Sequence, residues 1–398
     1  MASRTDTTAA ADDPADSVAT ALSSASFVRL LARADGDGLA AAGLLARALR
    51  SVDVPFQVRV DATGADAPAG GDDLLVGVGS ADANADVTVA PEGTPASLRA
   101  YRVAAEIEDG AAGPDPVLAL AGVVADGATP ASAAGRLVET AEAAGAIARR
   151  PGVAVPVDDV VDGLAHSTLL RSPLSGDRDA AATALSSLSL PDAGTDADAE
   201  THRAIASRVA LAVAGDDDAT PRAADAVERV LRPYATPEGP AATLGGFADV
   251  LTAVARERPG TGVALALGHG GADAALDAWR EHGRAVHSAL DAATTTRHDG
   301  AFVVGVADEA SGTPGRLATI ARLVRDFRSP EPLVVAVGDG VAATSARESG
   351  AADAAATLAA EFPAADAGWT GGPTRALVGI DPDTPVSELV AAIRGRSA

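Results

Sequence analysis

The side chains best placed to bind a metal ion or to act in catalysis are two aspartates, Asp35 and Asp37, in the segment LLARADGDGLAAAG. The apolar run at 27–34 predicts a strand, the Ala- and Leu-rich residues that follow predict a helix, and Gly36 and Gly38 allow a tight turn between them. Carboxylates at the end of a strand in an α/β sheet are a usual place for a divalent cation. Asp-Gly pairs are also ordinary turn and N-cap residues, so both interpretations stay open.

The segments around this turn predict the elements that position it. Apolar runs at 55–60 and 73–79 predict two more strands, and 86–90 predicts a weaker one. Strands that alternate with helices at this spacing favour a parallel sheet. We therefore predict an α/β protein whose N-terminal domain, residues 25–156, is built on a parallel sheet, preceded by a flexible acidic tail at 1–24.

The remainder of the chain divides into two parts. Residues 157–261 have a punctuated helical pattern and are predicted to form a helical connector. Residues 262–398 resume the alternation of strands and helices, and predict a smaller C-terminal α/β domain. Its strands are predicted at 262–268, 302–308, 333–340 and 375–380.

The charge of the chain is unusual. It has 55 acidic and 31 basic side chains, a net charge of −24, and no lysine, so every basic side chain is Arg. An acidic, lysine-free chain rich in Ala and Val is typical of proteins that work in concentrated salt, where the Debye length is ~3 Å or less and self-repulsion is screened. Nucleic acid is therefore not excluded as a ligand, but its binding would depend on a few well-placed Arg contacts.

The chain has no cysteine and no long apolar stretch, and these two absences exclude several classes of protein. There is no cysteine, which excludes a disulfide framework, a thiolate zinc site and a cysteine nucleophile. No apolar stretch has the length of a membrane span, and the first residues do not resemble a secretory signal. We expect a cytoplasmic protein with no membrane partner.

The turn at Asp35 resembles the first motif of the DHH phosphoesterase superfamily, a His-x-Asp-x-Asp-Gly turn followed by a helix of small residues. Asp35, Asp37 and Gly38 match this motif, while Arg33 stands in the place of its His. The last motif of RecJ-like members, a Gly-x-x-x-Asp turn, is similar to the segment that ends at Asp126.

Between these matches the chain departs from the superfamily. Gly77 stands where the second motif has an Asp, and Pro91, Glu92 and Gly93 stand where the name-giving Asp-His-His is expected. The first of the six His residues is His166, so the whole first domain lacks imidazole.

The resemblance implies hydrolysis by two close metal ions, Mn²⁺ or Mg²⁺, that activate a water molecule. Asp35, Asp37 and Asp126 are the remaining candidate ligands and catalytic groups. They are enough for one hard cation, but not for two at catalytic spacing without the missing Asp. We therefore expect a degenerate metal site.

The C-terminal part resembles the DHHA1 domain. In the segment TSARESG, Ser345 and Arg347 match the region where an Arg of that family contacts a substrate phosphate, a role that suits the bidentate guanidinium. The family's Gly-Gly-Gly-His loop is similar to GWTGGPTR, in which Gly371 and Gly372 persist and Pro373 replaces the His. An ordinary surface role for Arg347 stays open.

The motifs and the charge leave three functions open. The first is a RecJ-like protein of DNA replication or repair that no longer cleaves and acts by binding single-stranded DNA or RNA, or replication proteins such as GINS. The second is an active Mn²⁺- or Mg²⁺-dependent single-strand exonuclease or oligonucleotide phosphodiesterase. Its altered metal site would recruit additional carboxylates from Asp82, Asp86 or Glu92. The third is a scaffold without nucleic-acid contact.

Overall fold

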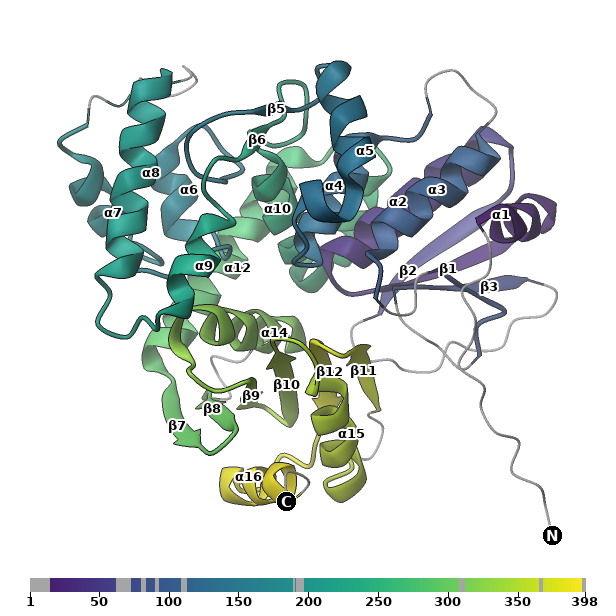
Figure 1. The fold of residues 1–398 in the computed structure, drawn as a ribbon. Helices are drawn as coiled ribbons and strands as arrows, with labels where there is room; N and C mark the ends of the chain where they lie inside the picture. The colour runs from purple at the N-terminus through teal and green to yellow at the C-terminus, as the bar shows by residue number, and fades with distance from the viewer. Residues whose placement is uncertain are drawn as a thin grey trace, which may run out of the picture.

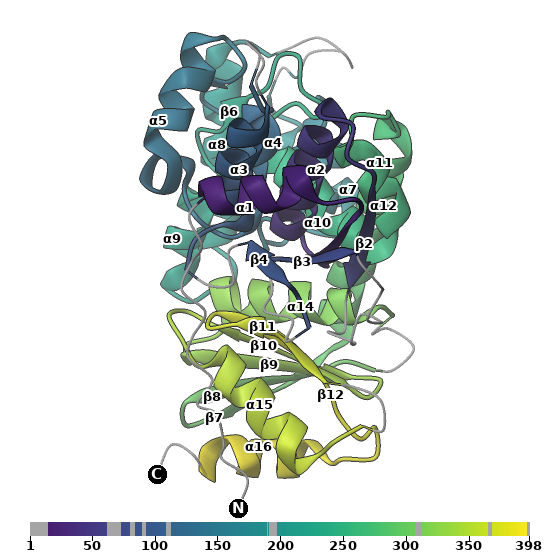
Figure 2. The same ribbon diagram turned by 90° about the vertical axis from the view of Figure 1, so that its right-hand side faces the viewer.

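The computed structural model describes the chain in segments, and all structural statements below concern these residues: 15–61, 73–79, 84–89, 93–108, 113–188, 190, 197–307, 312–364 and 368–395. The chain forms two α/β lobes with a helical part beside the first (Figure 1). In the view of Figure 2 the first lobe lies above the second, and helix α14 lies between them.

The N-terminal lobe contains the parallel sheet that the sequence predicts. Its four strands lie in the order β2-β1-β3-β4, all parallel. They are β1 (Val28–Arg33), β2 (Phe56–Asp61), β3 (Leu74–Val78) and β4 (Val87–Val89). Because parallel strands carry their C-terminal ends to one edge, the turn after β1 lies at the same edge as the ends of β3 and β4.

Helix α2 (Gly36–Ser51) follows β1 directly and is buried along almost its whole length. It packs against α3 (Ala96–Ile107), α4 (Pro116–Ala125) and α10 (Leu244–Glu257). Its Ala and Gly residues allow these helices to approach closely, as at Gly43, where a Cβ would lie 2.7 Å from the Cβ of Ala266. The lobe also includes α5 (Pro130–Ala143).

The prediction of a flexible tail is wrong for residues 15–24, which form helix α1 (Ala15–Ser24). Val18, Ala19 and Leu22 are buried, and α1 packs on α3. Their spacing of three to four residues is an amphipathic signal that the surrounding Ala, Asp and Ser obscured. The first fourteen residues lie outside the described part of the chain.

The middle of the chain is helical, as predicted. A short pair of strands, β5 (Ala148–Arg149) and β6 (Tyr234–Ala235), ties its start to its end. Its helices before α10 are α6 (Val160–His166), α7 (Arg178–Leu185), α8 (Ala199–Ala214) and α9 (Arg222–Glu228).

The strand predicted at 262–268 is wrong, because these residues belong largely to helix α11 (Pro259–Ala266). Pro259 starts the helix, where its missing N–H has no cost. A short run that is apolar on every side does not distinguish a buried strand from a buried helix. Helix α12 (Ala272–Ala292) follows, and both α11 and α12 pack with α10 in the core of the first lobe.

The C-terminal lobe is a six-stranded mixed sheet in the order β11-β12-β10-β9-β8-β7. Only β8 and β9 pair in parallel, and helix α14 (Pro314–Leu323) with the π-helical turn η1 (Val324–Arg328) connects them. The other face of the sheet is covered by α15 (Ala351–Glu361) and α16 (Val386–Gly395). The strands are β7 (Thr294–His298), β8 (Ala301–Gly305), β9 (Leu333–Gly338), β10 (Val341–Ala346), β11 (Trp369–Gly372) and β12 (Arg375–Gly379). None of the described helices has the length and apolarity needed to cross a membrane.

Two buried histidines on α12 make stability depend on pH. Burial lowers the pKa of His287 to about 3 and also lowers the pKa of His282. An unfolded histidine binds its proton near pH 6.5, so below that pH the unfolded chain takes up protons that the folded chain does not. The stability associated with His287 is therefore complete above pH 6.5 and is lost as the pH falls toward 3.

We expect the free energy of unfolding to fall by about 1.4 kcal/mol per pH unit between about pH 6 and 4 on account of His287. Urea titrations in molar KCl at a series of pH values measure this slope. The His287→Gln variant should have a shallower slope, and the exposed His269→Gln serves as its control. Equal slopes for His287→Gln and the unsubstituted chain would contradict the assignment.

Candidate functional site

Asp35 caps the helix that follows the first strand. Its Oδ1 accepts a hydrogen bond from the backbone N–H of Gly38 at 2.8 Å, and its Oδ2 accepts one from Nε of Arg33 at 2.5 Å. A Cβ at Gly38 would lie 2.5 Å from the carbonyl oxygen of Arg33, so the turn requires glycine there. The sequence prediction of a tight strand-to-helix turn is confirmed.

Asp37 is almost completely buried, and its carboxylate caps the N-terminus of helix α3 rather than that of its own helix. Its two carboxylate oxygens accept hydrogen bonds from the backbone N–H groups of Ala96 and Ser97, at 2.7 and 2.9 Å. These groups open α3, whose N-cap residue, Pro95, supplies no side-chain cap. Asp37 thus satisfies the first turn of α3 from a distance in the chain.

Asp126 completes the group of carboxylates that the sequence predicted to come together. It caps the C-terminus of α4 rather than a separate turn, because Gly122 lies inside that helix and packs against Ser97. Nη2 of Arg33 lies 3.6 Å from Asp126 and 3.5 Å from Asp37. The Arg33 guanidinium therefore lies among all three carboxylates.

The charges of this group shift one another's pKa values. Burial acts to lower the pKa of Arg33, but the charges of Asp35 and Asp37 outweigh it and raise that pKa. Burial acts to raise the pKa of Asp35, but the charges of Arg33 and Arg375 bring it far below its ordinary value. Burial and the charge of Asp126 raise the pKa of Asp37. Arg33 and Asp35 are thus a permanently charged pair.

Arg375 reaches the same carboxylates from the other lobe. It lies at the start of β12, and its guanidinium donates a short hydrogen bond to Oδ1 of Asp126 and another to the carbonyl oxygen of Ala125 at 3.2 Å. Its Nη2 lies 3.8 Å from Asp35. Arg375 was not among the residues predicted from the sequence, although it follows closely on Pro373, where the family's His was expected.

These residues do not fit a pair of divalent cations. Among the described residues no group of three carboxylates or imidazoles is arranged to hold a metal ion. Asp35, Asp37 and Asp126 have backbone N–H or guanidinium donors where a metal would need free oxygens. Of the extra ligands considered, Asp86 accepts a hydrogen bond from the backbone of Leu75. Asp82 and Glu92 lie outside the described residues.

The residues predicted to contact phosphate lie beside Arg375. Ser345 is buried in β10, where its hydroxyl accepts a hydrogen bond from Arg325 at 3.1 Å, and it pairs with Arg375 across the sheet. Arg347 is exposed just after this strand.

The two predicted loop glycines instead belong to strand β11. Gly372 pairs with Arg375, and Gly371 has a φ of 141°. A Cβ at Gly371 would lie 2.3 Å from the carbonyl oxygen of Arg375. These glycines bring β11 close to β12, and any contact with phosphate stays a prediction.

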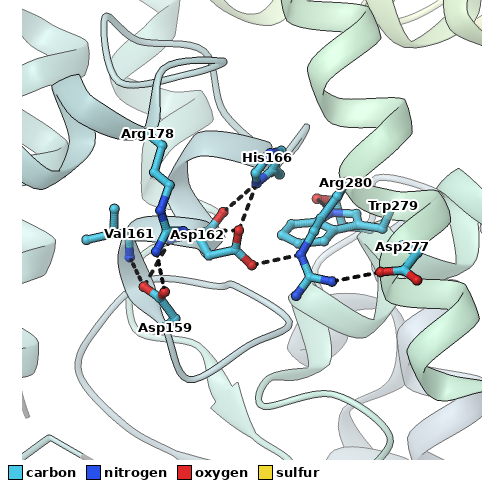
Figure 3. Close-up of polar contacts among 9 residues, drawn as sticks. Asp159, Val161, Asp162, His166, Arg178, Asp277, Trp279 and Arg280 are labelled. Atoms are coloured by element: carbon cyan, nitrogen blue, oxygen red, sulfur yellow. Dashed lines mark hydrogen bonds and ion pairs between the residues drawn. The ribbon is translucent and has the colours of Figure 1, made fainter. Parts of the chain in front are cut away.

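His166 is a structural residue of the connector (Figure 3). Its Nδ1 lies 3.1 Å from Oδ1 of Asp162, and its ring packs edge-on against Trp279 of α12. Asp162 also accepts from Arg280 at 2.9 Å and from Arg178 at 3.2 Å. The hydrogen bond from His166 is the main cause that lowers the pKa of Asp162 to about 2. This cluster joins α6 and α7 to α12.

Comparison with known proteins finds a relative that is similar over nearly the whole chain. The uncharacterized protein rrnAC1427 of Haloarcula marismortui is 46% identical over 389 residues, which cover 96% of each chain. Residues 293–395 match a family model described as the C-terminal domain of uncharacterized protein rrnAC1427.

Solved structures show the same fold at low sequence identity. CDC45 from Entamoeba histolytica matches with a TM-score of 0.60 at 8% identity, over 96% of this chain and 99% of that one. An exonuclease RecJ bound to manganese matches with a TM-score of 0.50 at 14% identity, over 96% and 94%. RecJ of Thermus thermophilus with Mg²⁺ matches with a TM-score of 0.52 at 14% identity. The present chain spans 52% of that protein's length.

Proposed function

Because this chain belongs to the family of rrnAC1427 and has the fold of RecJ and CDC45, we propose that it is a DHH-superfamily protein that binds single-stranded nucleic acid without cleaving it. In this role it would act in the cytoplasm, in DNA replication or repair. The loss of cleavage rests on the site at Asp35, and the binding rests on the arginines of the C-terminal lobe.

The observation that carries the proposal is the position of Arg33. A metal-dependent phosphodiesterase needs cations that bind water, lower its pKa and present it as hydroxide. The guanidinium of Arg33 lies among the same carboxylates, but it has no open coordination position and stays protonated. It therefore stabilises the site without supplying a nucleophile.

The arginines near β10 support binding. Arg347 is exposed, and it forms no ion pair with any residue that the structure describes. Arg325 donates to the carbonyl oxygen of Ala346, the residue before Arg347, at 3.2 Å. An exposed guanidinium on an acidic protein is suited to a backbone phosphate, which it binds through two hydrogen bonds.

The test combines cleavage and binding in molar KCl with Mn²⁺. We expect labelled single-stranded DNA and RNA to remain intact while fluorescence anisotropy reports binding. The Arg347→Gln variant should bind about tenfold more weakly, equivalent to ~1.4 kcal/mol. Arg394→Gln, which removes an exposed Arg of the same lobe, serves as the matched control.

Two outcomes would redirect the proposal. Mn²⁺-dependent cleavage that disappears in Asp126→Asn would establish an active phosphodiesterase with an altered metal site. Intact strands with no binding by any variant would favour a scaffold that contacts replication proteins such as GINS.

A further inference from the structure

Arg375 connects the two lobes through the carboxylate centre, the group formed by Asp35, Asp37 and Asp126. It is anchored on β12 of the C-terminal lobe, and its guanidinium bonds to the end of α4 in the N-terminal lobe, at Asp126 and the carbonyl oxygen of Ala125. Its side chain is 25% exposed and that of Asp126 is 30% exposed. The contact is therefore partly shielded, and salt screens it less than an ion pair on the open surface.

The sheet fixes where the Arg375 side chain begins. Arg375 lies between Ser345 on one neighbouring strand and Gly372 on the other. Gly371 of β11 lies so close to the carbonyl oxygen of Arg375 that a side chain at position 371 would not fit. With its backbone held on both sides, Arg375 loses little further entropy when its guanidinium reaches Asp126.

The charge of the centre favours a second cation. Three carboxylates and Arg33 give a formal charge of −2, and Arg375 reduces it to −1. A divalent ion there would be repelled by the guanidinium of Arg33, which lies within 3.6 Å of each carboxylate. A second guanidinium is planar and weakly hydrated, and its several N–H donors match a carboxylate and a carbonyl together.

We infer that the carboxylate centre is a guanidinium-binding site, that its occupant is Arg375, and that this contact holds the two lobes closed on the side of the centre. The inference is independent of the proposed binding of nucleic acid, since it rests only on contacts within the chain. The carboxylate centre thus binds a side chain of its own protein, Arg375, in place of a pair of metal ions.

A second set of contacts joins the lobes elsewhere. Glu257 of α10 accepts two hydrogen bonds from Arg316 of α14, at 2.7 and 2.8 Å, and one from His282 at 2.8 Å. Arg256 of α10 donates to Thr319 of α14. Loss of the Arg375 contact should therefore let the lobes open on one side while α10 and α14 keep them joined on the other.

Chemical rescue tests the identity of the ligand. We expect Arg375→Ala to unfold at a lower temperature than the unsubstituted chain, and millimolar ethylguanidinium to restore part of the lost Tm in molar KCl. Mn²⁺ should not restore it, and Arg394→Ala, the matched control, should respond to neither. A Tm of Arg375→Ala that rises with Mn²⁺ and not with ethylguanidinium would overturn the inference.

The distance between the lobes gives a second measurement. Since the chain has no cysteine, the exposed residues Val52 and Val386 can be replaced by cysteine and spin-labelled. Pulsed electron paramagnetic resonance should give one narrow distance distribution, which broadens toward longer distances in Arg375→Ala. If Arg375→Ala fails to fold, Asp126→Ala removes the carboxylate that Arg375 contacts in the other lobe and should give a broadening in the same direction. Unchanged distances in a folded variant would show that the contact does not hold the lobes.

Discussion

Replacing Arg33 with methionine is expected to lower the free energy of unfolding by about 3–5 kcal/mol, the cost of removing one partner from a buried charge cluster. The guanidinium is 17% exposed, and Asp35 and Asp37 are almost fully buried beside it. Methionine has a similar length but leaves these carboxylates without their nearest cation. Urea unfolding in molar KCl measures the loss.

The dependence of this loss on pH identifies its cause. Without Arg33, we expect burial to raise the pKa of Asp35 in the folded chain above its unfolded value. Stability is then lost as the pH rises through this range, so the deficit of the variant should shrink as the pH falls.

The matched control is Arg29→Met on the same strand. Its ion pair with Asp73 is about one third exposed on each side, so its loss should cost about 1 kcal/mol or less. Equal losses for the two variants would mean that Arg33 does not hold the carboxylates.

A second large loss of free energy of unfolding is expected when Asp249, a buried carboxylate in α10, is replaced by alanine. It accepts hydrogen bonds from the indole N–H of Trp279 at 2.8 Å, the hydroxyl of Ser167 at 3.1 Å, and both the backbone N–H and the hydroxyl of Thr168, at 3.0 and 2.5 Å. Asp249→Ala leaves these donors unsatisfied, and each such group costs about 1–3 kcal/mol. We expect a loss of about 4 kcal/mol after partial relaxation.

Tryptophan fluorescence reports the loss of the Asp249 carboxylate directly, because Trp279 donates a hydrogen bond to it. Trp279 is fully buried, whereas Trp369, the other tryptophan, is 39% exposed. The emission of Trp279 should shift to longer wavelength in Asp249→Ala even before unfolding. The control Asp277→Ala removes a carboxylate with a 68% exposed side chain and should change stability by no more than about 0.5 kcal/mol. A stable Asp249→Ala with unchanged emission would contradict the prediction.

Local patterns were enough to predict much of the first lobe. The turn at Asp35 is predictable because Arg33, Asp35 and Gly38 interact within a few residues of one another. The resemblance to the superfamily also brought Asp126 to the same site. The roles of these residues were not predictable, because Asp37 caps a helix that begins 59 residues later.

Arg375 illustrates the limit of the sequence more sharply. It lies 249 residues from Asp126, and no periodicity or motif relates the two. Only the pairing of β12 with β10 and β11 brings it to the carboxylates. The wrong strand at 262–268 has a similar origin, since α11 packs not only on the preceding helix α10 but also on α2, which lies far earlier in the chain.

Arg33 precedes the carboxylates Asp35, Asp37 and Asp126 in the chain, whereas Arg375 is translated long after them. This difference has a consequence for synthesis on the ribosome. At about 5–20 residues per second, the 249 residues between Asp126 and Arg375 take about 12–50 s to translate. During that time α10 to α12 complete the N-terminal lobe, whose carboxylates still lack their distant partner. Arg33, two residues from Asp35, emerges with them and is the cation available for that lobe to fold. The nearby guanidinium thus serves the growing chain as well as the finished protein, whereas the distant one serves only the finished protein.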